Sequence, residues 1–173
     1  GLDTLVHVAN GIHQHCPNDE AHDLFKLPSF IDKMMENKWL GSKTGQGFYK
    51  KEGKEILSLD LDTLEYRAAK KASFATLELT KTIDKPIDRF RVLVKGKDKA
   101  GDFYRKNFAA MFGYVQNRIP EISDELYRLD DAMKAGFGWE NGPFEIWDAI
   151  GVEAGIELMK AENLPVAKWV TEM

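Results

Sequence analysis

The chain has 173 residues, and its 43% hydrophobic and 30% charged residues are typical of a folded globular protein rather than a disordered segment. The formal net charge of −4 is small and argues against a strongly basic nucleic-acid-binding protein. One cysteine, Cys16, excludes an intrachain disulfide and fits a reducing cytoplasm, and no apolar run approaches the roughly 20 residues of a membrane span.

The first third of the chain predicts two helices followed by a loop. Apolar residues recur at helical spacing from the second residue onward: Leu2, Leu5, Val6, Ala9 and Ile12. They predict a helix over residues 3–15. A second helix is expected over residues 28–37, because Pro28 suits a first helical position. Residues 40–47 contain three glycines and are expected to form an ordered loop rather than a helix.

The middle of the chain predicts one hairpin and then helices. Residues 48–57 flank Glu52-Gly53, where glycine suits the positive φ of a tight turn. Helical patterns then cover three stretches, at residues 66–82, 86–94 and 102–135. We expect a boundary between two subdomains somewhere within residues 57–101.

The end of the chain repeats its beginning in outline. A turn at residues 141–143 precedes an apolar helical pattern. Residues 151–158 can then be aligned with residues 1–8, and Leu-Pro at 164–165 matches Leu-Pro at 27–28. This similarity predicts a duplicated helical unit, with the first copy lacking its beginning and the second lacking its end.

Three early segments together resemble the tail of the C-terminal domain of 3-hydroxyacyl-CoA dehydrogenases: GLDT at residues 1–4, LP at 27–28 and LGSKTGQGFY at 40–49. Three later segments resemble the front of the same domain: NR at 117–118, DDAM at 130–133 and GPFE at 142–145. This order resembles the multidomain proteins of fatty-acid β-oxidation. In these, a nucleotide-binding domain is followed by two such helical units and joined to an enoyl-CoA hydratase domain.

The resemblance implies a mainly α fold, similar to the C-terminal domain of 6-phosphogluconate dehydrogenase, in two related units with at most one short β-hairpin. Residues 1–57 would be the tail of the first unit, residues 58–101 connecting helices or a linker, and residues 102–173 the front of a second, partial unit. The chain is therefore expected to be a piece of a longer parent protein.

The resemblance also implies the parent's activity, which is the NAD-dependent oxidation of L-3-hydroxyacyl-CoA to 3-ketoacyl-CoA. In this family a His and a Glu on the nucleotide-binding domain carry the proton transfer, and both precede the helical units. We therefore expect no catalytic or cofactor-binding residue here, NAD only in the parent, and no activity of the isolated segment. The implied partners are acyl-CoA, the nucleotide-binding and hydratase domains of the same chain, and a second copy in a homodimer.

Two residues are candidates for substrate contact. Asn117 matches the family's active-site Asn, although in the second copy, and its amide is able to donate to a thioester or 3-keto oxygen. The neighbouring Arg118 is expected to form a salt bridge or a cap. Lys43 is the other candidate, since a lysine in a glycine-rich loop suits the phosphates of CoA.

The loop around Lys43 does not match known phosphate-binding patterns. Ser42 stands where the Walker pattern requires glycine, and Lys50 stands where a dinucleotide-binding pattern requires its third glycine. Our main interpretation is a structural loop that turns the chain into Phe48. Contact with CoA phosphates in the parent is the alternative.

Other polar clusters receive structural interpretations. All four histidines lie beside Cys16 in the first 22 residues, in an expected helix and loop, and we predict no metal site there: His7, His13, His15 and His22. The segment 136–144 predicts a tight turn with Trp139, Phe144 and Trp147 in the core. The acidic residues around it are interpreted as solvated faces and helix N-terminal charges rather than acid-base pairs: Asp130, Asp131, Glu140, Glu145 and Asp148.

Two functional hypotheses remain open. In the first, the chain forms one wall of an acyl-CoA site in the dehydrogenase. In the second, it is a non-catalytic helical module for dimerisation or domain packing that does not touch substrate. A self-contained protein that reuses the fold for another activity is a third, weaker alternative. Binding of a CoA ligand distinguishes the first two.

Overall fold

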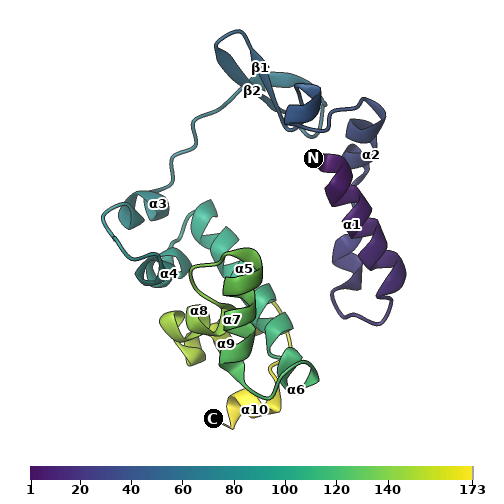
Figure 1. Cartoon of the computed structure of the whole chain (residues 1–173). Helices are drawn as coiled ribbons and strands as arrows, with labels where there is room; N and C mark the ends of the chain where they lie inside the picture. Colours follow the sequence, from purple (N-terminus) through teal and green to yellow (C-terminus); the bar gives the residue numbers. More distant parts are fainter. Residues whose placement is uncertain (173) are drawn as a thin grey trace. The chain divides into compact units, whose positions relative to one another are not determined.

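The computed structural model describes residues 1–172. The chain divides into two compact units, one formed by Gly1–Lys71 and the other beginning at Ala72. The expected mainly α architecture is confirmed, because helices supply most of the regular structure in the described residues (Figure 1). None of these helices is long and apolar enough to cross a lipid bilayer.

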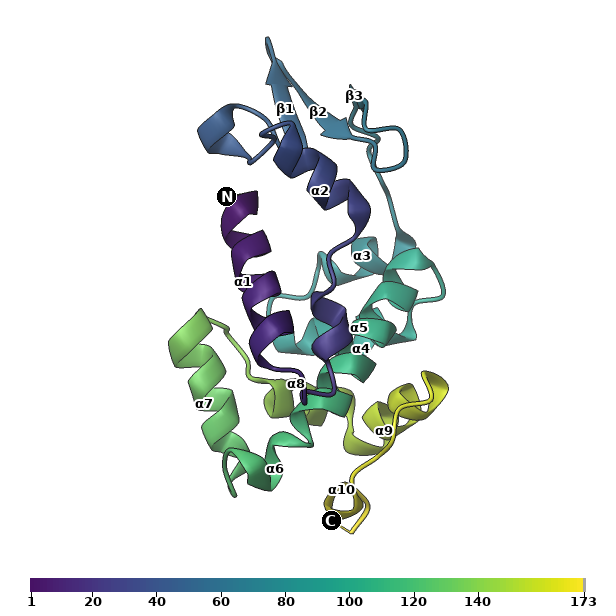
Figure 2. The same ribbon diagram turned by 90° about the vertical axis from the view of Figure 1, so that its right-hand side faces the viewer.

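The first unit combines helices with a small sheet. Its helical elements are α1 (Leu2–His15), the short 3₁₀ helix η1 (His22–Phe25), α2 (Ser29–Glu36) and the 3₁₀ turn η2 (Ser42–Thr44). Its strands are β1 (Tyr49–Glu52), β2 (Glu55–Leu59) and β3 (Tyr66–Ala68). The strands are antiparallel in the order β1-β2-β3 and lie beside α2 (Figure 2).

A small apolar core joins these elements. Leu2 of α1, Ile31 and Met34 of α2, and Leu59 of β2 are buried together. Fully burying a side chain of this size contributes about 1.5–3 kcal/mol. Leu5 belongs to the same sequence pattern but is 53% exposed. Fewer residues of α1 are therefore buried than its apolar sequence pattern predicts.

The hairpin forms as expected, but a third strand extends it. Gly53 has a φ of 60° in the turn between β1 and β2. Residues 66–68 were expected to be helical and instead form β3, in which Ala68 pairs with Leu57. The Tyr66 hydroxyl donates to the carbonyl of Gly47 at 2.6 Å, and its ring packs beside Trp39. Tertiary pairing has thus overridden a weak helical pattern.

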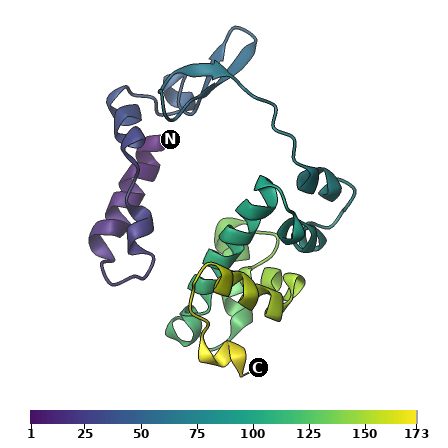
Figure 3. The ribbon, with the colours of Figure 1, turned by 180° about the vertical axis from the view of Figure 1, so that it is seen from behind.

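The second unit is helical throughout its described regular structure. Its helices are α3 (Ala75–Thr80), α4 (Pro86–Lys95), α5 (Lys99–Val115), α6 (Arg118–Glu121), α7 (Leu126–Phe137), α8 (Pro143–Ile150), α9 (Val152–Ala161) and α10 (Lys168–Thr171). The long helix α5 packs against α4, α8 and α9, and it is the teal-green helix that crosses the second unit diagonally in Figure 3.

The continuous helical stretch expected over residues 102–135 is broken into α5, α6 and α7. Pro120 has no backbone N–H to continue a helix, and it restricts the residue before it. Ile119 accordingly has extended angles, with φ −107° and ψ 121°. The prediction of one continuous helix was therefore wrong at residues 116–117 and 122–125, which lie outside α5, α6 and α7.

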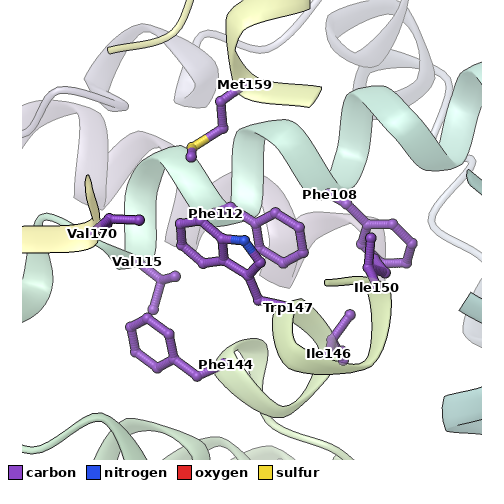
Figure 4. Packing of buried hydrophobic residues seen from close by; sticks show 9 residues of the cluster. All are labelled: Phe108, Phe112, Val115, Phe144, Ile146, Trp147, Ile150, Met159 and Val170. Carbon is purple, nitrogen blue, oxygen red and sulfur yellow. The ribbon is translucent and has the colours of Figure 1, made fainter. Parts of the chain in front are cut away.

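The core of the second unit is built on one face of α5. Phe108, Phe112 and Val115 are buried together with Trp147 of α8 and Met159 of α9. Figure 4 shows Phe112 beside Trp147 and Phe108 beside Ile150. The rings of Phe112 and Trp147 stack with their centroids 4.6 Å apart. Both rings are almost completely shielded from solvent, and they form the centre of this core.

The buried side-chain amide of Gln116 binds the segment at residues 165–167 to this core. Gln116, only 1% exposed, donates from Nε2 to the carbonyl of Pro165 at 2.8 Å. Its Oε1 accepts from the N–H of Ala167 at 2.8 Å. Both ends of the side chain therefore have partners in one distant segment, so that burial leaves neither unsatisfied.

Asp98 joins the beginnings of two helices. Its carboxylate accepts from the N–H of Thr76 in α3 at 2.9 Å and from the N–H of Gly101 in α5 at 3.0 Å. These two hydrogen bonds lower the pKa of Asp98 to about 2. The charged form is therefore the one that stabilises the second unit.

Replacing Asp98 with alanine is expected to lower the Tm of the second unit by about 5 °C at neutral pH, because two helix-start N–H groups lose their acceptor. The folded pKa of about 2 lies below the ordinary value of 3.8, so this stabilisation is present above pH 4 and lost as the pH falls toward 2. Calorimetry of both proteins over this range measures the difference in Tm. A difference that stays constant down to pH 2 would contradict the assignment.

Candidate functional site

The glycines of the Lys43 loop are required by the loop itself. The N–H of Gly41 donates to the carbonyl of Gln46 at 2.8 Å, which closes the loop. Gly41 and Gly45 have φ values of 105° and 77°, a region that favours glycine. A Cβ at Gly47 would lie 2.9 Å from the backbone N and Cα of Gly41. Local geometry thus accounts for all three glycines.

Lys43 lies on the surface of this loop. Its ammonium forms an ion pair with the carboxylate of Asp3 at the start of α1, and this contact lowers the pKa of Asp3. Exposed pairs of this kind contribute little to stability. A strongly charged ligand can therefore compete for Lys43 at small cost.

Asn117 and Arg118 follow the end of α5. The side chain of Asn117 is exposed, and its backbone N–H donates to the carbonyl of Tyr114 at 3.2 Å. The Arg118 guanidinium lies 4.3 Å from the centre of the Tyr114 ring, and its Nε lies 3.1 Å from a carboxylate oxygen of Glu121. The expected salt bridge of Arg118 is thereby confirmed.

An apolar cavity of about 330 Å³ opens beside this helix end. Arg118 alone is charged among the described residues that line it: Met111, Tyr114, Val115, Arg118, Ile122, Leu129, Ala132, Met133, Trp139 and Pro143. Ligand sites are typically apolar pockets with one or a few polar groups, of about 300–1,000 Å³. The sequence did not single out this cavity, because its wall comes from four helices that are separated along the chain.

The acidic residues of the GPFE region hold two helices together. Asp130 of α7 is 5% exposed and accepts from the N–H groups of Phe144 and Glu145 at the start of α8, at 2.8 and 3.2 Å. Burial raises the pKa of Asp130, while these hydrogen bonds oppose that shift. Asp130 was expected on a solvated face or as a helix N-terminal charge. Asp130 acts as a negative charge at the N-terminus of α8, but it is buried rather than solvated.

Glu145 completes this helix start. Its carboxylate accepts from Lys134 of α7 at 2.6 Å and from the N–H of Gly142 at 2.8 Å, and both lower its pKa. These contacts assign Glu145 to structure, as expected. A Cβ at Gly142 would lie 2.3 Å from the Cα of Asp130, so only glycine fits this crossing.

The aromatic residues of this region divide into two groups. Phe144 and Trp147 are 6% and 4% exposed, as expected for core residues. Trp139 was also expected in the core but is 38% exposed, where it lines the apolar cavity. The left-handed C-terminus of α7 at Gly138 ends the helix just before Trp139. That turn separates Trp139 from the core positions of α7.

The four histidines and Cys16 are close in the sequence but do not form one cluster in the structure. His7, His15 and Cys16 are exposed at the surface of the first unit. His13 instead stacks on His22 of η1, with ring centroids 4.0 Å apart. The turn after α1 folds the chain back and brings these two rings together.

The candidate substrate residues lie in different units, Lys43 in the first and Asn117 in the second. Within the first unit, a cavity of about 460 Å³ lies on the loop that carries Lys43. Within the second, Asn117 directly precedes Arg118, which lines the apolar cavity. Each candidate therefore has a concave surface nearby on its own unit.

Comparison with known proteins identifies three relatives. The chain is 40% identical to a probable 3-hydroxyacyl-CoA dehydrogenase of Bacillus subtilis over all 173 residues, which is 22% of that protein. It is 26% identical to a putative fatty acid oxidation complex trifunctional enzyme of Rickettsia felis, over 84% of this chain and 19% of the relative. The corresponding Rickettsia prowazekii protein is 24% identical, over 98% of this chain and 23% of the relative.

The chain thus spans about a fifth of the length of the curated relatives it matches. No protein-family model and no solved structure matches it. The resemblance inferred from the sequence motifs is confirmed by the names of these relatives. The chain is homologous to one segment of the 3-hydroxyacyl-CoA dehydrogenases.

Proposed function

From this homology, we propose that the chain is the helical substrate-side and domain-association part of an NAD-dependent L-3-hydroxyacyl-CoA dehydrogenase of cytoplasmic fatty-acid β-oxidation. The observation that carries the proposal is the 40% identity over all 173 residues to the Bacillus subtilis protein. The parent would oxidise 3-hydroxyacyl-CoA to 3-ketoacyl-CoA, with NAD accepting the hydride. The two units would be the tail of one helical domain and the front of a second.

The described residues do not fit a nicotinamide dinucleotide. Such a site requires parallel strands joined by a helix, with a glycine-rich turn at the start of that helix. The strands described in this chain form an antiparallel meander, and Lys50 stands in place of the third glycine. We therefore assign NAD binding and the catalytic pair to a nucleotide-binding domain of the parent. The chain by itself is expected to be inactive.

The apolar cavity supports a substrate-side role. An acyl chain is apolar, and Met111, Leu129 and Met133 offer it a matching surface. Arg118 at this cavity and Asn117 beside it would donate to the thioester or the 3-keto oxygen. Lys43 would contact a phosphate of CoA.

Exposed apolar side chains favour the alternative of a packing module. Leu5 and Val8, three residues apart on α1, are 53% and 50% exposed. In the second unit Ile122 and Phe137 are 67% and 76% exposed. Large exposed apolar groups are typical of surfaces that pack against another domain or subunit. Both roles are compatible with one chain, but only the first requires substrate contact.

Calorimetric titration of the purified chain with acetoacetyl-CoA tests the substrate-side role. We expect saturable binding that is stronger than that of free CoA, because the acyl group adds apolar burial. Asn117→Ala is expected to weaken binding of the acyl ester, and Lys43→Ala to weaken both ligands equally.

Two matched variants serve as controls for this titration. Asn107→Ala and Lys33→Ala remove exposed side chains of the same types on α5 and α2. They are expected to leave both affinities unchanged. Equal loss in candidate and control variants, or no detectable binding by the wild-type chain, would exclude substrate contact and leave the packing module.

A further inference from the structure

We propose that His13, His22 and Asp23 form a binding site for a divalent transition-metal ion such as Zn²⁺. One ring nitrogen from each histidine and one carboxylate oxygen of Asp23 all lie within 4.8 Å of one another. The three residues come from the end of α1 and from η1, so they belong to one compact unit. The proposal does not depend on the proposed enzymatic role.

The two imidazole rings carry nitrogens that lack partners. His13 Nε2 and His22 Nδ1 are buried, and neither has a hydrogen-bond partner in the described residues. Burying such an atom without a partner is unfavourable. The rings stack with centroids 4.0 Å apart and 27° between their planes. A shared cation would satisfy both nitrogens at once.

The surrounding charges favour a cation. His13 lies in the last turn of the 14-residue helix α1, where the helix dipole presents its negative end. Asp23 adds a full negative charge, and one of its carboxylate oxygens lies within 4.8 Å of a nitrogen of each ring. Lys26 lies 2.7 Å from Oδ1 of Asp23, and a carboxylate has capacity for a second partner.

The loop between the two histidines is already ordered by its own hydrogen bonds. The N–H of Ala21 donates to the Asp19 carboxylate at 2.7 Å, and the N–H of His22 donates to the Asp19 carbonyl at 3.0 Å. The N–H of Cys16 donates to the carbonyl of Ile12 at 2.8 Å. The ligands are therefore positioned in advance, which lowers the entropic cost of binding.

The set of two imidazoles and one carboxylate selects the class of metal. Neutral imidazole and carboxylate ligate Zn²⁺, whereas Mg²⁺ and Ca²⁺ prefer oxygen ligands alone. Three protein ligands leave a fourth position of a tetrahedral ion for water. The site differs from the His-Gln-His-Cys group in the sequence, because His15 and Cys16 are not among its ligands.

Titration of the untagged, chelator-treated chain with ZnCl₂, followed by calorimetry, tests the site. We expect one Zn²⁺ per chain, with the affinity lowered about tenfold or more in His13→Ala and in His22→Ala and by a smaller factor in Asp23→Asn. His15→Ala removes an exposed histidine of the same helix and is expected to leave the affinity unchanged. Far-ultraviolet circular dichroism of each variant confirms that it is folded.

Substitution of Co²⁺ identifies the ligands independently. Nitrogen and oxygen ligands in a tetrahedral arrangement are expected to give visible absorption without a thiolate charge-transfer band. A thiolate band that Cys16→Ser removes would assign the metal to Cys16 and overturn the proposal. Absence of saturable Zn²⁺ binding, or binding that His13→Ala and His22→Ala both retain, would overturn it as well.

Discussion

Replacing Phe112 with alanine is expected to lower the free energy of unfolding of the second unit by about 3–5 kcal/mol. Its ring is 0% exposed and stacks on Trp147 at 4.6 Å and on Phe108 at 6.0 Å. Truncation removes these contacts and leaves a cavity that the surrounding rings cannot easily fill. Hydrogen exchange of peptides from α5 and α8 as a function of denaturant measures the change.

Phe103→Ala is the matched control for this prediction. Phe103 lies on the same helix α5 but is 59% exposed, so its removal is expected to cost less than about 1 kcal/mol. Phe112→Leu keeps an apolar group in the core and leaves the unit measurable if the alanine variant is too unstable. Equal losses for Phe103→Ala and Phe112→Ala would show that the stacked rings do not form the core.

Replacing Gly142 with alanine is expected to destabilise the second unit by about 3 kcal/mol. The added Cβ would lie 2.3 Å from the Cα and Cβ of Asp130. The backbone of α7 cannot move away without breaking the hydrogen bonds that Asp130 accepts from the N–H groups of α8. Denaturant unfolding monitored by the exchange of α7 and α8 peptides measures this loss.

The matched control Gly136→Ala is expected to raise the stability of the second unit rather than lower it. Gly136 lies in α7, and a Cβ there would meet no atom within 4 Å. Alanine is the better helix former, so the variant is expected to gain about 0.5 kcal/mol. Loss of stability in both glycine variants would mean that the tight contact at Gly142 is not the cause.

The sequence predicted the strongest local patterns of the fold. The helix at the start of the chain, the helix beginning at Pro86 and the turn at Gly53 all formed where capping, apolar spacing or a positive φ marked them. The predictions were wrong where contacts between residues that are distant in the sequence determine the local structure or the burial of a side chain. Tyr66 lies in a strand that pairs with β2, and its hydroxyl donates to the carbonyl of Gly47. Trp139 lies at a cavity wall rather than in the core.

The candidate sites were less predictable from sequence than the fold. Motif matching singled out Asn117 and Lys43, whose contact with substrate stays a prediction. The apolar cavity at Arg118 and the pairing of His13 with His22 both depend on how separated segments meet. No local pattern in the sequence carries that information.

The buried amide of Gln116 fixes how residues 164–167 align on the core of the second unit. Leu164 and Val166 pack by apolar contact, and such contacts lose little if the segment slides along the core. The amide is different, because it needs a carbonyl and an N–H at fixed positions, which Pro165 and Ala167 supply. A shift of one residue would bury both ends of Gln116 without partners, so this side chain discriminates against misaligned packing more than it adds to stability.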